Sequence, residues 1–137
     1  METQSYKPRN SPPFEYKITI KPEDIDELGH VNNVVYLRWV QQVAAAHWNS
    51  RALSPITSKY LWVVLRHEID YLRPALLNDE ITAQTWVSSM EGVKSVRNVK
   101  FSVNGNDLAQ AKTVWCLIDA LTMKPKRIGE DIKNIFT

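Results

Sequence analysis

One segment of this chain has helical periodicity, and nearly everything after it alternates with the period of a β-strand. Residues 33–49 contain neither glycine nor proline, and apolar positions recur there at helical spacing, at Tyr36, Val40, Val43, Ala44 and His47. The apolar surface extends further around the helix through Leu37, Ala45, Ala46 and Trp48. We therefore expect one helix of about 25 Å that is buried on most sides.

Five segments show the alternation of half-buried strands. One covers residues 14–20, and four follow the helix at about 61–71, 80–90, 93–104 and 107–121. Simple alternation along the first of these four puts on one face Leu61, Val63, Leu65, His67, Ile69 and Tyr71. The tight-turn pairs Glu91-Gly92 and Asn104-Gly105 predict hairpins between the last three strands. Because the helix is the only large apolar partner, the pattern predicts an α+β fold in which a five-stranded antiparallel sheet packs on a long central helix.

The length and composition fit one domain. A chain of 137 residues that is 44% hydrophobic and 23% charged can bury a single core and has little room for a second. Residues 1–13 carry Pro8, Pro12 and Pro13 among polar neighbours, so we expect a flexible arm there and a single domain over residues 14–137.

Several partners are disfavoured by composition. The net charge is only +2 and most basic residues are scattered, which argues against a nucleic-acid-binding face. No run of about 18 apolar residues occurs, so we expect neither a signal peptide nor a membrane span. The single cysteine, Cys116, lies in an apolar run and is expected to be a packed thiol, which suits a reducing, cytoplasmic location.

Apolar side chains also occur on the sheet face that is expected to point away from the helix. By alternation these are Trp86, Met90, Val96, Val114, Cys116 and Ile118. A solvated sheet face does not need so much apolar surface, so we expect a subunit interface there.

Residues 24–36 are the segment where a catalytic site is most strongly indicated. Two aspartates, a histidine and two amides stand directly ahead of the helix. The N–H groups at a helix start carry partial positive charge and can polarise a carbonyl, while a carboxylate just upstream attacks it or activates water. The same residue types also occur at ordinary loop–helix junctions, where Asn32 or Asn33 would be the N-cap. Residue types alone leave both interpretations open.

The string Asp26-x-x-Gly-His-Val-Asn-Asn-x-x-Tyr36, followed by a long helix and four strands, resembles the hotdog-fold acyl-CoA thioesterases of the 4-hydroxybenzoyl-CoA thioesterase type. The resemblance covers residues 14 to about 128. It implies that the sheet wraps the helix and that two protomers form one continuous sheet with active sites at their interface. It also implies that such homodimers associate into tetramers, and that an acyl-CoA is hydrolysed without a cofactor or a metal.

The same resemblance implies roles for individual residues. Asp26 falls on the catalytic aspartate, as nucleophile or general base, and the backbone N–H groups of Val34 and Val35 would polarise the thioester carbonyl. The side chains that would shape the pocket are those of His30, Asn32 and Tyr36. Many relatives carry a glutamate and an arginine further along the helix, where this chain has Gln41 and Ala44, so that second carboxylate is absent.

Other candidate residues and functions are less well supported by the sequence. A magnesium pair of Asp24 and Asp26 lacks further ligands, and His47 and His67 are expected to be hydrogen-bonded core residues. Trp39 or Trp62 is a candidate for lining an acyl pocket. Candidates for contacting coenzyme A phosphates are Arg66, Arg73, Lys94 and Arg97. A non-catalytic hotdog module that binds acyl-CoA or a protein stays open, a hotdog dehydratase is disfavoured, and neither the acyl group nor its carrier is set by the sequence.

Overall fold

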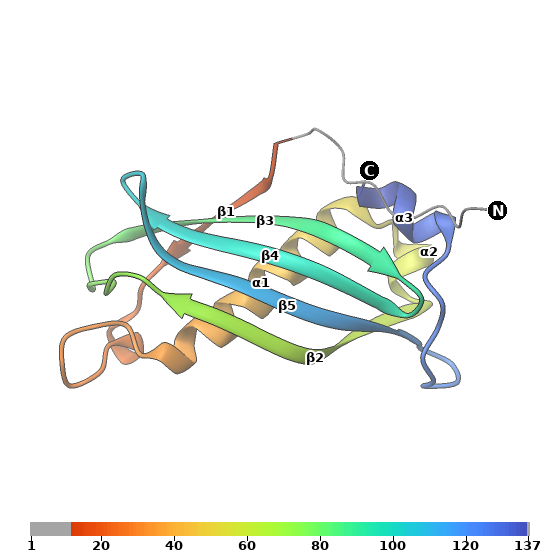
Figure 1. Ribbon diagram of the computed structural model, residues 1–137, viewed down its shortest axis with the longest axis horizontal. Coiled ribbons are helices and arrows are strands. Elements are labelled where there is room, and N and C mark those ends of the chain that lie inside the picture. The colour runs from red at the N-terminus through yellow and green to blue at the C-terminus, as the bar shows by residue number, and fades with distance from the viewer. Residues whose placement is uncertain (1–11, 137) are drawn as a thin grey trace.

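A five-stranded antiparallel sheet packs across one long helix in the computed structural model, which describes residues 12–136 (Figure 1). The strands are β1 (Phe14–Thr19), β2 (Tyr60–Tyr71), β3 (Glu80–Glu91), β4 (Lys94–Val103) and β5 (Asn106–Asp119). Their order in the sheet is β1-β3-β4-β5-β2, so β2 is an edge strand. The predicted α+β class and the order of the elements are confirmed. Of the expected arm, residues 1–11 lie outside the described part of the chain.

The long helix α1 (Asn33–Arg51) begins where the sequence indicated, because Asn32 is its N-cap. The Asn32 side chain accepts a hydrogen bond from the Val34 N–H at 3.1 Å. The buried positions follow helical spacing on one face and are Val35, Tyr36, Trp39, Val40, Val43, Ala44, His47 and Trp48. Burial on most sides was expected, but Gln41, Gln42 and Ala45 are exposed, so the helix buries one face only.

A β-bulge in β2 changes which residues face the helix. The pairing of β2 with β5 shifts between Val64 and Arg66, so Leu65 is an extra residue on β2. The prediction that a single alternation runs along this strand was therefore wrong. Before the bulge, Trp62 packs toward the helix, while the residues on either side of it in β2 are exposed. After the bulge, Ile69 packs toward the helix. The exposed apolar residues of the first half are Leu61, Val63 and Leu65.

A second register shift lies in β3, between Val87 and Ser89. It places Met90 on the helix side, where the side chain is 2% exposed and packs with Trp48, so the assignment of Met90 to the outer face was wrong. Cys116 and Ile118 are already buried within the protomer. The outer apolar surface on these strands is thus smaller than expected, and consists of Trp86, Val96 and Val114.

Three short elements were not predicted: η1 (Pro22–Asp24), α2 (Ser54–Thr57) and α3 (Glu130–Phe136). Helix α3 packs through Ile132, which is fully buried beside Trp48 and Leu117. In Figure 1, α2 and α3 lie near the end of α1 that is opposite the loop carrying Asp26. No helix among residues 12–136 is long and apolar enough to cross a membrane.

Candidate active site

Asp26 lies in a tight turn between η1 and α1. Its Oδ1 accepts hydrogen bonds from the N–H groups of Leu28 at 2.9 Å and His30 at 3.2 Å, and its carbonyl accepts one from Gly29 at 3.0 Å. Gly29 has a φ of 80°, which glycine adopts without strain. The turn holds one carboxylate oxygen, and Oδ2 is therefore left without a donor among the described residues.

This carboxylate lines a cavity of about 400 Å³ at the start of α1. Four of the predicted site residues meet there, namely Asp26, His30, Asn32 and Tyr36. The opposite wall comes from the end of β2 and the loop that follows it, through Tyr71, Leu72, Arg73, Pro74 and Ala75. The half-buried Asp26 side chain is thus next to the helix start and not in open solvent.

The two N–H groups predicted to polarise a carbonyl already have acceptors. The Val34 N–H bonds to Asn32 Oδ1, and the Val35 N–H bonds to the Asn32 carbonyl at 2.9 Å. Neither valine lines the cavity. Asn33, the first residue of α1, does line it, and within residues 12–136 its N–H meets no acceptor. Sequence reasoning treated Asn33 only as a possible N-cap, although its place in the first turn was a signal.

Two tyrosines join the end of β2 to the start of α1. Tyr71 donates a hydrogen bond from its hydroxyl to the Asn33 carbonyl at 3.1 Å, and its ring meets that of Tyr36 edge to face at 5.4 Å. Burial, with the nearby Tyr71 and Asp79, raises the pKa of Tyr36 to about 12. The Tyr36 hydroxyl is therefore protonated at neutral pH and able to donate a hydrogen bond.

Of the four basic residues considered for phosphate contacts, Arg73 is the one beside Asp26 in this cavity. Arg66 forms an ion pair with Glu68 on the exposed edge of β2. Arg97 is 5% exposed and bonds to His47 and Thr85 in the interior. Arg73 is thus the basic residue best placed for a charged group bound near Asp26.

Nothing in the described part of the chain resembles a metal centre. No group of three or more histidine, cysteine or acidic side chains gathers there. Asp24 is paired with Arg38 instead of sharing a ligand with Asp26.

A second cavity, of about 310 Å³, lies toward the other end of α1. Its walls contain five aromatic side chains, those of Trp48, Tyr60, Trp62, Trp115 and Phe136. Gln41, at the position where the resemblance leads one to expect a carboxylate, also lines it. Of the two tryptophans considered for an acyl pocket, Trp62 is here, whereas Trp39 is 1% exposed in the core beside Phe101.

A sheet packed on a long helix, with an aspartate in a cavity at the helix start, defines a thioesterase domain of the hotdog fold. The chain belongs to the family of acyl-ACP thioesterase N-terminal domains, whose model matches residues 12–136.

Named relatives agree with this assignment. The chain is 26% identical over 130 residues to the acyl-CoA thioester hydrolase YbgC of Escherichia coli O6:H1, covering 90% of this chain and 95% of that protein. It is 27% identical over 125 residues to the long-chain acyl-CoA thioesterase FadM of Escherichia coli K12, covering 86% and 92%. The crystal structure of a thioesterase from Thermus thermophilus, complexed with coenzyme A and Zn, shares the fold, with a TM-score of 0.81, 24% identity and coverage of 93% and 94%.

Proposed function

We propose that this protein hydrolyses an acyl-CoA thioester to a free acid and coenzyme A, with Asp26 as the catalytic carboxylate. One observation carries the proposal: Asp26 and the Asn33 N–H line the same cavity at the start of α1. The names of YbgC and FadM support acyl-CoA as the substrate class. No cofactor is required, because hydrolysis needs only water and an activated carbonyl.

In the proposed mechanism, Asp26 Oδ2 attacks the thioester carbonyl carbon and forms a tetrahedral intermediate. The thiolate of coenzyme A leaves, and water then hydrolyses the resulting acyl anhydride to release the acid and regenerate the carboxylate. The Asn33 N–H donates to the developing oxyanion in place of the Val34 and Val35 groups, and one such donor contributes about 3 kcal/mol. If Asp26 instead acts as a general base, it removes a proton from the attacking water at the same place.

The test is a thiol-release assay on a panel of aliphatic and aromatic acyl-CoA thioesters and on acyl carrier protein thioesters. Release of coenzyme A from at least one class of thioester supports hydrolysis. Binding of acyl-CoA without thiol release would favour the alternative, a non-catalytic hotdog module. Faster hydrolysis of acyl carrier protein thioesters than of acyl-CoA would make acyl carrier protein the carrier of the acyl group, as in the name of the matched family.

We further propose that the protein is a homodimer joined along β2, with pairs of dimers associating through the outer sheet face. Strand β2 is a sheet edge of 12 residues with Leu61, Val63 and Leu65 exposed, and such an edge is a template for strand pairing. Two copies related by a two-fold axis through this edge pair in antiparallel fashion. The Tyr71 end of one β2 then lies beside the Tyr60 end of the other.

This pairing brings the two kinds of cavity together. Within one protomer they lie at different ends of α1, at about residues 33 and 48, which corresponds to roughly 22 Å along the helix. Across the paired edge, the Asp26 cavity of one protomer adjoins the aromatic cavity of its partner. We propose that the aromatic cavity receives the acyl group, whose chain length or ring its walls select.

Light scattering should give at least a dimer at micromolar concentration for the wild-type chain. Leu65→Asp places a charge on the exposed edge, where its folding cost is small, and should shift the protein toward monomer with loss of thiol release. Thr19→Asp is the matched control, since Thr19 is exposed on β1, the edge strand at the opposite side of the sheet. A wild-type monomer that is fully active would contradict the proposal.

Arg73 is proposed to contact the phosphates of coenzyme A. Arg73→Gln should raise KM for acyl-CoA by about tenfold, the scale of one charge-assisted hydrogen bond, and reduce the salt dependence of KM. Lys94→Gln, which removes an exposed charge on β4, is the control. An unchanged KM and salt dependence in Arg73→Gln would remove Arg73 from the coenzyme A site.

A further inference from the structure

We propose that Asp24 and Arg38 form an ion pair that positions Asp26 relative to the start of α1. This inference rests on the proposed function of Asp26, but neither residue lines the Asp26 cavity. Both therefore act through the loop that carries the catalytic carboxylate, as positioning residues.

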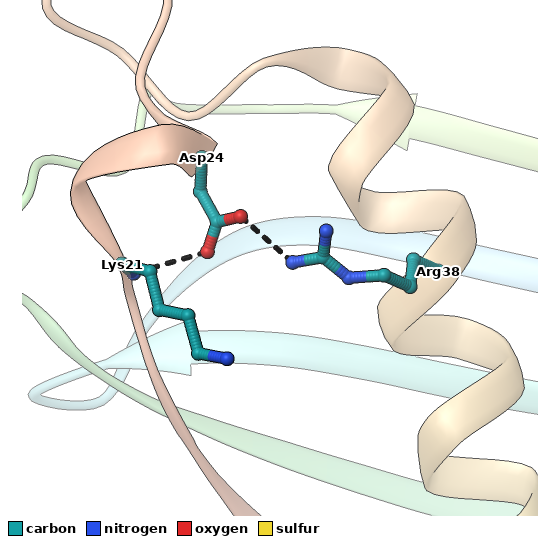
Figure 2. A network of polar contacts seen from close by, with 3 residues as sticks. All are labelled: Lys21, Asp24 and Arg38. Carbon is teal, nitrogen blue, oxygen red and sulfur yellow. Dashed lines mark hydrogen bonds and ion pairs between the residues drawn. The ribbon is translucent and has the colours of Figure 1, made fainter.

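Asp24 is the least exposed carboxylate on this side of the molecule, with 1% of its side chain exposed. Figure 2 shows its two oxygens held from different elements. Oδ1 accepts a hydrogen bond from Arg38 Nη2 on α1 at 2.7 Å, and Oδ2 accepts one from the Lys21 N–H at 3.0 Å. Burial opposes ionisation, but the hydrogen bonds from Arg38 and Lys21 outweigh it and lower the pKa of Asp24 below its usual value. Asp24 is thus charged at neutral pH.

The backbone around Asp24 is connected to the same helix start. The Asp24 carbonyl accepts a hydrogen bond from the N–H of the N-cap residue Asn32 at 2.9 Å. Two residues further on, the Asp26 N–H donates to the His30 carbonyl at 2.8 Å. A backbone hydrogen bond therefore joins the first and last residues of the loop 24–32. The Arg38 contact ties the first of them, Asp24, to the body of α1.

This ion pair differs from the other two within the described residues. Arg66–Glu68 and Lys100–Asp107 join side chains that are 36% to 67% exposed, and exposed pairs contribute little. Asp24 is buried, so removal of Arg38 leaves a buried charge whose side chain has the Lys21 backbone N–H as its one remaining partner among the described residues. We expect the loop to shift as water reaches Asp24, and this shift to carry Asp26 away from the Asn33 N–H.

Catalysis is sensitive to such movement, because a displacement of about 1 Å can cost about a hundredfold in rate. A loss of positioning should appear in kcat, since the coenzyme A contact at Arg73 and the aromatic cavity are untouched. A general loss of structure would instead lower the melting temperature and the amount of active protein together.

The experiment compares Asp24→Asn, Arg38→Gln, Arg38→Lys and the double variant Asp24→Asn/Arg38→Gln with the wild type. The control is Asp107→Asn, which breaks an exposed ion pair on the β4–β5 hairpin. Turnover, KM and melting temperature are measured together with amide hydrogen exchange over residues 26–35. If Asp24→Asn folds poorly, the Arg38 variants still report local opening of the loop by hydrogen exchange, because Arg38 is half exposed and its replacement keeps the core intact.

We expect kcat to fall between about tenfold and about a hundredfold in Asp24→Asn and Arg38→Gln, with KM within about twofold. Arg38→Lys should recover most of the turnover, and the double variant should be no slower than the worse single variant. Exchange should rise over residues 26–35 and not elsewhere. Wild-type kcat and exchange in the single variants overturn the inference, as does a fall in kcat matched by unfolding of the whole chain. If the positioning inference fails but Asp26→Asn is inactive in the same assay, the proposed function of Asp26 still holds. If Asp26→Asn is active, the proposed function fails, and the exchange data alone decide whether Asp24 and Arg38 hold the loop.

Discussion

Replacement of Asp26 with asparagine is expected to lower thioester turnover by at least about a hundredfold. Asparagine keeps an oxygen that can accept from the N–H groups of Leu28 and His30, so the turn around Gly29 should persist. What disappears is the ionised oxygen that attacks the thioester or activates water. The measurement is the rate of thiol release at saturating substrate, with the melting temperature recorded on the same preparation.

The neighbouring residue offers a matched control. Glu27 is an exposed carboxylate one position along the same turn and does not line the Asp26 cavity, so Glu27→Gln removes a charge without touching the proposed chemistry. It should retain nearly full turnover. An Asp26→Asn protein as active as Glu27→Gln would refute the assignment of Asp26.

Folding stability is expected to fall as the pH drops below about 6.5, because of His47. Its ring is 7% exposed, stacks on Phe14 at 4.8 Å, and has Nδ1 at 2.8 Å from Arg97 Nη1. Arginine can only donate, so Nδ1 accepts and the imidazole is neutral. Burial, followed by the positive charges of Arg97 and Arg51, lowers the pKa of His47 to about 3.

Because the folded-state pKa of His47 lies below the unfolded value, the unfolded chain binds a proton that the folded chain refuses. Stability is therefore unaffected above about pH 6.5 and declines from there toward pH 3, by up to about 1.4 kcal/mol per pH unit. Burial also lowers the pKa of His67, so this residue adds to the decline in the same window. Asp24, whose pKa is lowered from 3.8, contributes stability that is lost only at more acidic pH.

Urea unfolding between about pH 7 and about pH 5 measures this decline, in a window set by the two histidines. His47→Gln keeps an acceptor for Arg97 and should flatten the pH dependence, whereas His67→Gln, beside Thr113, should leave most of it. A His47→Gln protein that loses stability with the wild-type slope would show that His47 is not the group responsible.

The parts of the fold that follow from local sequence were predicted. The Asn32 cap, the helix after it and the hairpin at Asn104-Gly105 each depend on a few adjacent residues, and both turn residues of that hairpin have positive φ as the pair suggests. The extra residue at Leu65 left no local signal, since Leu fits either face of a strand. Helix α3 is only seven residues long, and its docking through Ile132 depends on distant contacts.

The candidate site was predicted to a similar depth. Asp26 and three residues of its motif meet in one cavity, because they lie within eleven positions of each other next to a helix start. Arg73 reaches this cavity only because the end of β2 packs beside the start of α1, which the local sequence does not indicate. The ion pair of Asp24 with Arg38 joins a loop to a helix across 14 positions of the chain. Asn33 replaces the two valines as the proposed oxyanion donor, because the side-chain and backbone oxygens of Asn32 accept hydrogen bonds from the Val34 and Val35 N–H groups.

The bulge at Leu65 divides β2 into two halves of opposite parity. Deleting that one residue would let the backbone ladder with β5 close without interruption, yet would turn Trp62 outward from the aromatic cavity and Val63 inward. Chimaeras with homologous chains therefore have to exchange the two halves of this strand in phase. A chimaera designed from an alignment whose gap is misplaced by one position here would form the sheet but present the wrong side chains to the aromatic cavity.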